Sequence, residues 1–177
     1  ARRIGKSTLV RQFAQNEYKS FVLFDFSKVS KEEKTLFDDL SDIDYFFTRL
    51  RLLKGVTLYE RESVIVFDEV QKYPIARQAI KALVEDGRYD YIETGSLISI
   101  HKNVEHIIIP SEEDVLGMYP MDYEEWMWAM GKENGYADMQ TALQKKRGFG
   151  DDVNRKLMRD FRLYMLVGGM PQAVSKY

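Results

Sequence analysis

The stretch SVIVFDEVQ, Ser63 to Gln71, decides the fold of this chain. A short apolar run bounded by polar residues is typical of a strand buried on both faces, as in a parallel sheet covered by helices. This run ends in two adjacent carboxylates, Asp68 and Glu69. Adjacent acids after a strand are often only a solvated turn, so their meaning depends on the other motifs in the chain.

The second motif is IGKST, Ile4 to Thr8, about sixty residues before the two acids. Gly5, Lys6 and Ser7 complete the pattern GxxxxGK(S/T), in which backbone amides at the start of a helix cradle phosphates. The leading glycine of the pattern would precede Ala1, and so would the strand that leads into the loop. We therefore expect the chain to be a fragment of a longer protein.

Together the two motifs predict a site for ATP and Mg²⁺. Lys6 would neutralise the β and γ oxygens, while the Ser7 hydroxyl and the Asp68 carboxylate would be the magnesium ligands. Glu69 would polarise the attacking water as a general base. The nucleotide-binding residues would be those of the loop and the helix start, namely Arg3, Ile4, Gly5, Lys6, Ser7 and Thr8.

A third group of polar residues ends the next predicted strand, in YDYIETGS at residues 89–96. Thr94 and Ser96 are both placed to orient the attacking water or to sense the γ phosphate, and we favour Ser96. A GK(S/T) tripeptide alone occurs often by chance. Its combination with one strand that ends in DE and another that ends in TGS argues for a nucleotide site.

The first 120 residues alternate predicted helices and strands, which indicates an α/β domain with a mostly parallel sheet covered on both faces. Gly55 and Gly87 should end two of the helices, and Pro74 should lie early in one. The predicted strands are 21–26, 63–68, 89–96 and 106–110, and the predicted helices follow Ser7, occupy 31–53 as an amphipathic pair, and extend from Pro74 toward Gly87.

Residues 121–177 are predicted to form a small helical region. Asp122 should cap a first helix, breaks are expected at 131–135 and 148–151, and a further helix should occupy 152–167. A basic stretch at 144–147 lies between the two breaks. Most of the aromatic cluster in this region is expected to pack in a core, and its members are Tyr119, Tyr123, Trp126 and Trp128.

The composition excludes several classes of protein. Lysine and arginine number 26 against 28 acids, so the net charge of −2 gives no overall attraction to nucleic acid, although local basic patches remain open. The absence of cysteine removes disulfides and zinc–thiolate sites, and His101 and His106 are expected to be surface or packing residues. No apolar run reaches the roughly 18 residues needed to span a bilayer. We expect a cytoplasmic protein with no membrane contact.

Several stretches in one order resemble a known family, the AAA+-like prokaryotic ATPases that pair an N-terminal ATPase domain with a C-terminal domain of uncharacterised, nuclease-like type. The resemblance covers nearly the whole chain. It implies an AAA-type P-loop sheet in residues 1–120, with Lys6 and Ser7 from Walker A, Asp68 and Glu69 from Walker B, and Ser96 at the phosphate-sensing position. The stretches are IGKSTLVRQFA, VIVFDEVQ, YIETGSLISI, MYPMDYEEWMWAMG and LVGGMPQAV.

The resemblance also implies that residues 168–177 lead toward a C-terminal domain. Many relatives carry a Gly-Arg pair before the segment that corresponds to MYPMDYEEW, whereas this chain has acids within residues 109–117. The sequence therefore does not identify the arginine finger. Arg77, Arg88 or an arginine from another subunit of a homo-oligomer would have to supply it. Such a residue contributes about 10³ to 10⁵ in rate.

Two functions follow as alternatives. One is an ATPase whose turnover changes its shape or its contact with a protein or DNA partner, and the other is an ATP-loaded switch or binding module with little hydrolysis. Glu69 favours the first, and the missing arginine favours the second. The sequence has no arginine-rich lid, which a nucleotide kinase would need, and no NKxD motif, which a GTPase would need.

Overall fold

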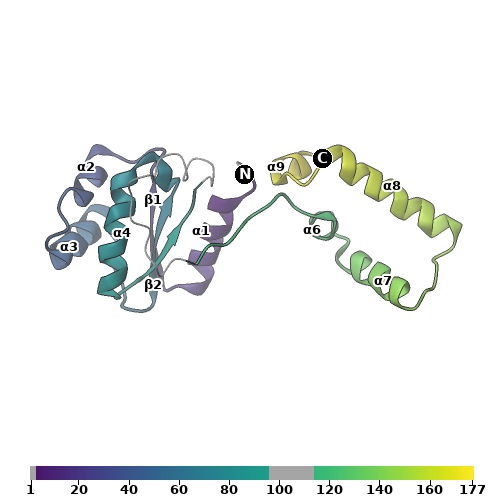
Figure 1. Cartoon of the computed structure of the whole chain (residues 1–177), viewed down its shortest axis with the longest axis horizontal. Coiled ribbons are helices and arrows are strands. Elements are labelled where there is room, and N and C mark those ends of the chain that lie inside the picture. The colour runs from purple at the N-terminus through teal and green to yellow at the C-terminus, as the bar shows by residue number, and fades with distance from the viewer. Residues whose placement is uncertain (1–2, 96–113) are drawn as a thin grey trace. The chain divides into compact units, whose positions relative to one another are not determined.

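A computed structural model describes residues 3–95 and 114–177 of the chain. The chain divides into two compact units, one comprising residues 6–116 and the other residues 1–5 together with 117–177. Figure 1 shows the helices and strands of both units. The predicted domain boundary at residue 120 stays a prediction, because a compact group of residues is not by itself a domain that folds alone.

The unit of residues 6–116 alternates helices and strands. Its elements, with 3₁₀ helices written as η, are α1 (Lys6–Glu17), β1 (Ser20–Asp25), α2 (Lys31–Lys34), η1 (Thr35–Phe37), α3 (Ile43–Lys54), β2 (Ser63–Asp68), η2 (Val70–Lys72), α4 (Pro74–Asp86) and β3 (Asp90–Glu93).

The three strands form one parallel sheet in the order β1-β2-β3. β2 lies between the other two, and all six of its residues are buried, as its apolar sequence predicts. The register pairs Asp25 with Asp68, and Phe67 with Glu93. The carboxyl ends of the three strands are therefore level, so that the residues that follow them share one edge of the sheet.

Helices cover both faces of this sheet (Figure 1). On one face, Val64 and Val66 of β2 pack with Val10 and Ala14 of α1. The other face carries the larger core, in which α3 and α4 cover the strands. Its buried residues include Val22, Phe24, Ile65, Phe67, Phe46, Phe47, Leu50, Ala79, Ile80 and Leu83. This arrangement confirms the predicted three-layer α/β fold.

Glycine and proline set helix limits where the sequence predicts them. α3 ends at Gly55 and α4 at Gly87, with left-handed φ angles of 60° and 72°. A residue with a Cβ adopts this conformation only with strain, which is why glycine ends helices. Pro74 is the first residue of α4, where its missing N–H costs no helical hydrogen bond.

The first of the two helices predicted in 31–53 is shorter than expected. A capping box of Ser30 and Glu33 starts α2, but only four residues are α-helical before η1 follows. Soon afterwards, the Asp39 carboxylate accepts hydrogen bonds from the amide and hydroxyl of Ser41. Such a local turn competes with helix continuation. The short helix therefore reflects polar residues that bond to their own backbone.

The unit containing residues 117–177 is helical. The Asp122 carboxylate accepts from the Glu125 amide at 2.9 Å, and the Glu125 carboxylate accepts from the Asp122 amide at 3.0 Å. This reciprocal pair is a capping box, so Asp122 caps its helix as predicted. The helices are α6 (Tyr123–Ala129), α7 (Glu133–Gln144), α8 (Asp151–Val167) and α9 (Pro171–Lys176).

The break expected at 131–135 is wrong in extent, because α7 begins at Glu133 and includes Gly135. Glycine, asparagine and aspartate weaken the helix signal of this segment. Tertiary packing outweighs that weakness, since Tyr136 and Met139 pack on the buried cluster around Trp126. The helix was therefore not recognisable from local preference.

The aromatic cluster of this unit is only partly a core. Trp126 is fully buried and stacks on Tyr123 with ring centroids 5.9 Å apart. Trp128 and Tyr119 are 50% and 80% exposed, so the expectation of core packing is wrong for these two. Tyr119 precedes α6, and Trp128 is not among the residues that pack in the buried cluster around Trp126.

Some predictions fall on residues outside the described ranges: Ser96, the strand at 106–110, and both histidines. In the parts of the chain that the structure describes, no helix is both long enough and apolar enough to cross a membrane.

Candidate functional site

The edge of the sheet formed by the carboxyl ends of the strands brings together residues from three separate segments. Ser7 lies in the first turn of α1, Asp68 is the last residue of β2, and Thr94 follows β3. The Ser7 hydroxyl donates to Oδ1 of Asp68 at 2.8 Å. The Thr94 hydroxyl donates to the same oxygen. The carboxylate is therefore held by two hydroxyls that the parallel register places beside it.

Thr94 is fixed by its backbone as well as by its side chain. Its amide donates to the Phe67 carbonyl at 2.9 Å, and its carbonyl accepts from the Val70 amide at 3.1 Å. The Thr94 hydroxyl oxygen also lies 3.3 Å from the Glu69 amide nitrogen, which donates to it. Both Asp68 and Thr94 are 6% exposed. Thr94 thus connects the end of β3 to Asp68 and to the turn that begins at Glu69.

Glu69 begins that turn in an unusual conformation. Its φ and ψ angles of 57° and 41° are left-handed, which is uncommon for a residue other than glycine. Strained backbone of this kind is concentrated at functional sites. Oε2 of Glu69 accepts a hydrogen bond of 2.7 Å from Nε2 of Gln71. The proposed base is therefore engaged by a neighbouring amide side chain.

The pair of Ser7 and Asp68 fits a magnesium ion. Mg²⁺ takes oxygen ligands at about 2.0–2.1 Å in octahedral geometry, so that two neighbouring ligands are about 2.9 Å apart. The two oxygens are 2.8 Å apart, which is the normal length of their hydrogen bond and is also close to this spacing. Within the described ranges there is no group of three or more histidine, cysteine or acidic side chains that could hold a metal ion by itself. A site with one carboxylate and one hydroxyl is nevertheless sufficient, because nucleotide-bound magnesium takes its other ligands from phosphate and water.

The residues predicted to bind phosphate lie directly before α1 and in its first turn. Lys6 is the first residue of this helix, and Ser7 and Thr8 complete its first turn. Before the helix, Arg3 and Gly5 have left-handed φ angles of 63° and 90°, which turn the chain sharply. Residues 3–5 belong to the other compact unit. The described structure therefore places Ser7 at Asp68, while the phosphate-binding roles of residues 3–6 and Thr8 stay predictions.

The arginines considered as substitutes for a finger are engaged within the chain. Arg77 is 4% exposed, and its Nε lies 3.4 Å from Oε2 of Glu93. Arg88 donates to both carboxylate oxygens of Asp86 at 2.7 and 2.8 Å, and to Asp44 at 2.6 Å. The hydrogen bonds and charge of Arg88 lower the pKa of Asp86. The Arg77 contact joins α4 to β3, and the Arg88 contacts join the end of α4 to α3.

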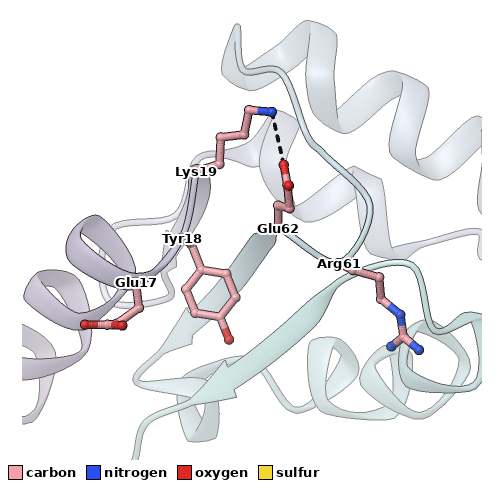
Figure 2. Close-up of a pocket in the computed structure, with 5 residues that line it drawn as sticks. All are labelled: Glu17, Tyr18, Lys19, Arg61 and Glu62. Atoms are coloured by element: carbon pink, nitrogen blue, oxygen red, sulfur yellow. Dashed lines mark hydrogen bonds and ion pairs between the residues drawn. The ribbon is translucent and has the colours of Figure 1, made fainter.

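An open pocket of about 310 Å³ lies at the opposite ends of the strands (Figure 2). Lys19 and Glu62, which directly precede β1 and β2, form an ion pair of 3.0 Å at its wall. Tyr18 donates to Asp90 at 2.7 Å, and burial together with this carboxylate raises the pKa of Tyr18 to about 12. The pocket is therefore separate from Asp68, and its other lining residues are Glu17 and Arg61.

Sequence reasoning ranked Thr94 below Ser96, yet Thr94 is the hydroxyl that the described structure places at Asp68. The predicted strand ran through both residues, whereas β3 ends at Glu93. Gln71 was not recognised at all. The sequence feature that could have identified Gln71 is its position in a turn, two residues after Glu69.

Comparison with known proteins gives one family and one distant relative. A family model described as an AAA domain matches residues 1–127. The chain is also 22% identical over 171 residues to the protein Aspartyl protease UND of Arabidopsis thaliana. That alignment covers 96% of this chain and 39% of the relative, so the chain spans less than half of the relative's length. No solved structure is significantly similar to the chain.

Proposed function

The chain belongs to the AAA domain family, whose model matches residues 1–127, and from this premise we propose that it is a magnesium-dependent ATPase. Membership of the family supports ATP binding. Magnesium use is supported by one observation above all. Ser7 at the start of α1 and Asp68 at the end of β2 place a hydroxyl and a carboxylate oxygen 2.8 Å apart.

Each residue of the site has a separate task in this proposal. The first-turn amides of α1 and the Lys6 ammonium bind the β and γ phosphates, because a helix start and a cation both attract anions. Ser7 and Asp68 would hold the magnesium ion. When bound, that ion would neutralise the negative charge that develops on the transferred phosphoryl group. Thr94 holds the Asp68 carboxylate in place, and Ser96 remains the proposed phosphate sensor.

Glu69 acts as the general base in this proposal. A water oxygen attacks the γ phosphorus, and Glu69 accepts the proton that the water loses. The bond between the γ phosphorus and the bridging oxygen breaks, and ADP leaves with the electron pair. Glu69 directly follows Asp68, at the point where the left-handed backbone ends the strand.

A specific observation favours the second candidate function, an ATP-loaded switch with little hydrolysis. The Glu69 carboxylate accepts the 2.7 Å hydrogen bond from Gln71, so it has a partner other than water. Arg88 is bound to two carboxylates. Hydrolysis would then be slow until another subunit or a partner supplies an arginine. A protein or DNA partner, a homo-oligomer, a cytoplasmic location and a C-terminal nuclease-like domain stay predictions.

Peptide hydrolysis, which the name of the Arabidopsis relative suggests, is not favoured by the site. Aspartic proteases use two carboxylates that share a proton. Asp68 instead accepts hydrogen bonds from the hydroxyls of Ser7 and Thr94, and Glu69 accepts one from Gln71.

The proposal is tested by ATP binding and turnover of the full-length protein with and without Mg²⁺. Asp68→Asn should abolish the magnesium dependence and reduce turnover at least about tenfold, because the anionic ligand is lost. Asp39→Asn, on an exposed turn, is the matched control and should leave both unchanged. Tight magnesium-dependent ATP binding without measurable turnover would support the second candidate function, the ATP-loaded switch. Magnesium-dependent turnover that survives Asp68→Asn would contradict the assigned site.

A further inference from the structure

Charge is distributed unevenly along the helical unit. Residues 144–162 contain seven cationic and three acidic residues, a net charge of +4 in a chain whose net charge is −2. The stretch comprises the end of α7, the connection to α8 and most of α8. The chain therefore contains a basic segment although its total charge is nearly balanced. Such a segment attracts an anionic partner.

Of the three acids of this stretch, one is buried and two are exposed. Asp160 is 5% exposed, and its carboxylate lies 2.5 Å from the Lys132 ammonium. Asp151 and Asp152 occupy the first turn of α8, where negative charge is favoured by the helix dipole. All seven cations are exposed, so they outnumber the exposed acids by seven to two.

Three arginines form a row along α8. Arg155, Arg159 and Arg162 are spaced by four and three residues, so they lie within an arc of about 60° and extend over about 10 Å of the helix. None of the three makes an ion pair with another described residue. Arg155 donates only to the Asp151 carbonyl, at 3.2 Å. Guanidinium groups bind phosphate with paired hydrogen bonds, so the row suits a chain of phosphates.

The connection before α8 adds an exposed aromatic ring. Phe149 is 40% exposed, and it stands between Gly148 and Gly150. Its ring contacts no other aromatic ring in the described ranges. The neighbouring Lys145, Lys146 and Arg147 are exposed as well. This connection therefore offers both features that bind a single strand. The exposed ring can stack on a base, and the neighbouring cations can bind phosphates.

We propose that the surface formed by residues 145–149 with Arg155, Arg159 and Arg162 binds single-stranded nucleic acid. The cations neutralise successive phosphates, and Phe149 stacks on an unpaired base. Bases in a duplex are already stacked on one another, so the exposed ring selects single strands. The surface lies wholly in the unit of residues 117–177, and it does not depend on the proposed ATPase activity.

Fluorescence anisotropy of the full-length protein with dye-labelled oligothymidylate of about 20 nucleotides tests this inference. Phe149→Ala should weaken binding by about fivefold to a hundredfold, the range for the loss of one stacked base. The triple variant Arg155→Gln/Arg159→Gln/Arg162→Gln should reduce the slope of log affinity against log salt by about 2, because three phosphate contacts are lost.

Matched controls come from the other unit. Tyr45→Ala removes a 60% exposed ring, and Lys28→Gln/Lys31→Gln/Arg51→Gln removes three exposed charges. Both should leave affinity and salt slope close to wild type, and circular dichroism should show that all variants are folded.

Two results would overturn the inference. One is that the protein does not bind the oligonucleotide specifically through this surface. It would be seen as an absence of binding, or as binding that the control triple variant and the α8 triple variant weaken equally. The other is equal or tighter binding to a duplex of the same length or to phosphatidylserine-rich vesicles, with no effect of Phe149→Ala. The second result would assign the basic surface to duplex or membrane instead.

Discussion

Ser7 and Asp68 are 61 residues apart in the chain, and their side chains are joined by a hydrogen bond of 2.8 Å at one edge of the sheet. The contact exists because α1 begins at the same edge at which β2 ends. It brings a helix start, which favours anions, next to a carboxylate, which favours cations. A magnesium–nucleotide complex satisfies both preferences at once.

Replacing Lys6 by alanine should weaken ATP binding at least about tenfold, because the ammonium is the main side-chain charge offered to the phosphates. Titration calorimetry of the full-length protein measures the effect. Lys81→Ala, on the exposed side of α4, is the matched control. Equal ATP affinity for Lys6→Ala and wild type would show that the phosphates bind elsewhere.

Glu69→Gln should preserve ATP binding and reduce hydrolysis at least about a hundredfold, as is typical for the loss of a general base. The substitution keeps the size of the side chain and removes its charge. Single-turnover phosphate release measures the chemical step directly. If the rate stays at the wild-type value, Glu69 is a structural acid and the base lies elsewhere.

Thr94→Val should lower the free energy of unfolding by about 1–3 kcal/mol, because the Asp68 carboxylate and the Glu69 amide each lose a buried partner. Magnesium-dependent ATP affinity should fall as well, since Asp68 is no longer held. Thr94→Ser keeps the hydroxyl and should recover most of both properties. Equal losses in the two variants would instead implicate the methyl group and its packing.

Asp86→Asn should produce a pH-dependent loss of stability. Because Arg88 lowers the pKa of Asp86 in the folded state, the carboxylate stabilises the fold above its unfolded pKa of about 3.9, and this contribution disappears as the pH falls further. We expect a deficit of about 1 kcal/mol at pH 7 that vanishes near pH 2. Thermal unfolding across this range measures it.

Glu60→Gln, at an exposed position, is the control for the Asp86 variant and should show no such pH dependence. A deficit in Asp86→Asn that is the same at pH 2 and pH 7 would mean that the ion pair with Arg88 does not cause it.

The local elements of this protein are readable from its sequence because their causes are local. A short apolar run rich in β-branched residues favours a strand buried on both faces, as β2 is. Left-handed glycines, a proline at a first helical position and the capping box at Asp122 and Glu125 each act within a few residues. For the same reason, the position of the two acids at the end of a strand was predictable.

The contacts of the site were decided only by the tertiary structure. Thr94 reaches Asp68, rather than facing away from it, because the register pairs Phe67 with Glu93 and the Thr94 amide extends that pairing to the Phe67 carbonyl. The bond from Gln71 to Glu69 depends on a left-handed turn that no local preference indicates. Helix α7 likewise forms because it packs on Trp126, despite a weak intrinsic preference. Sequence determined which elements form, since propensity and capping are short-range, whereas long-range packing and register decided which side chains meet.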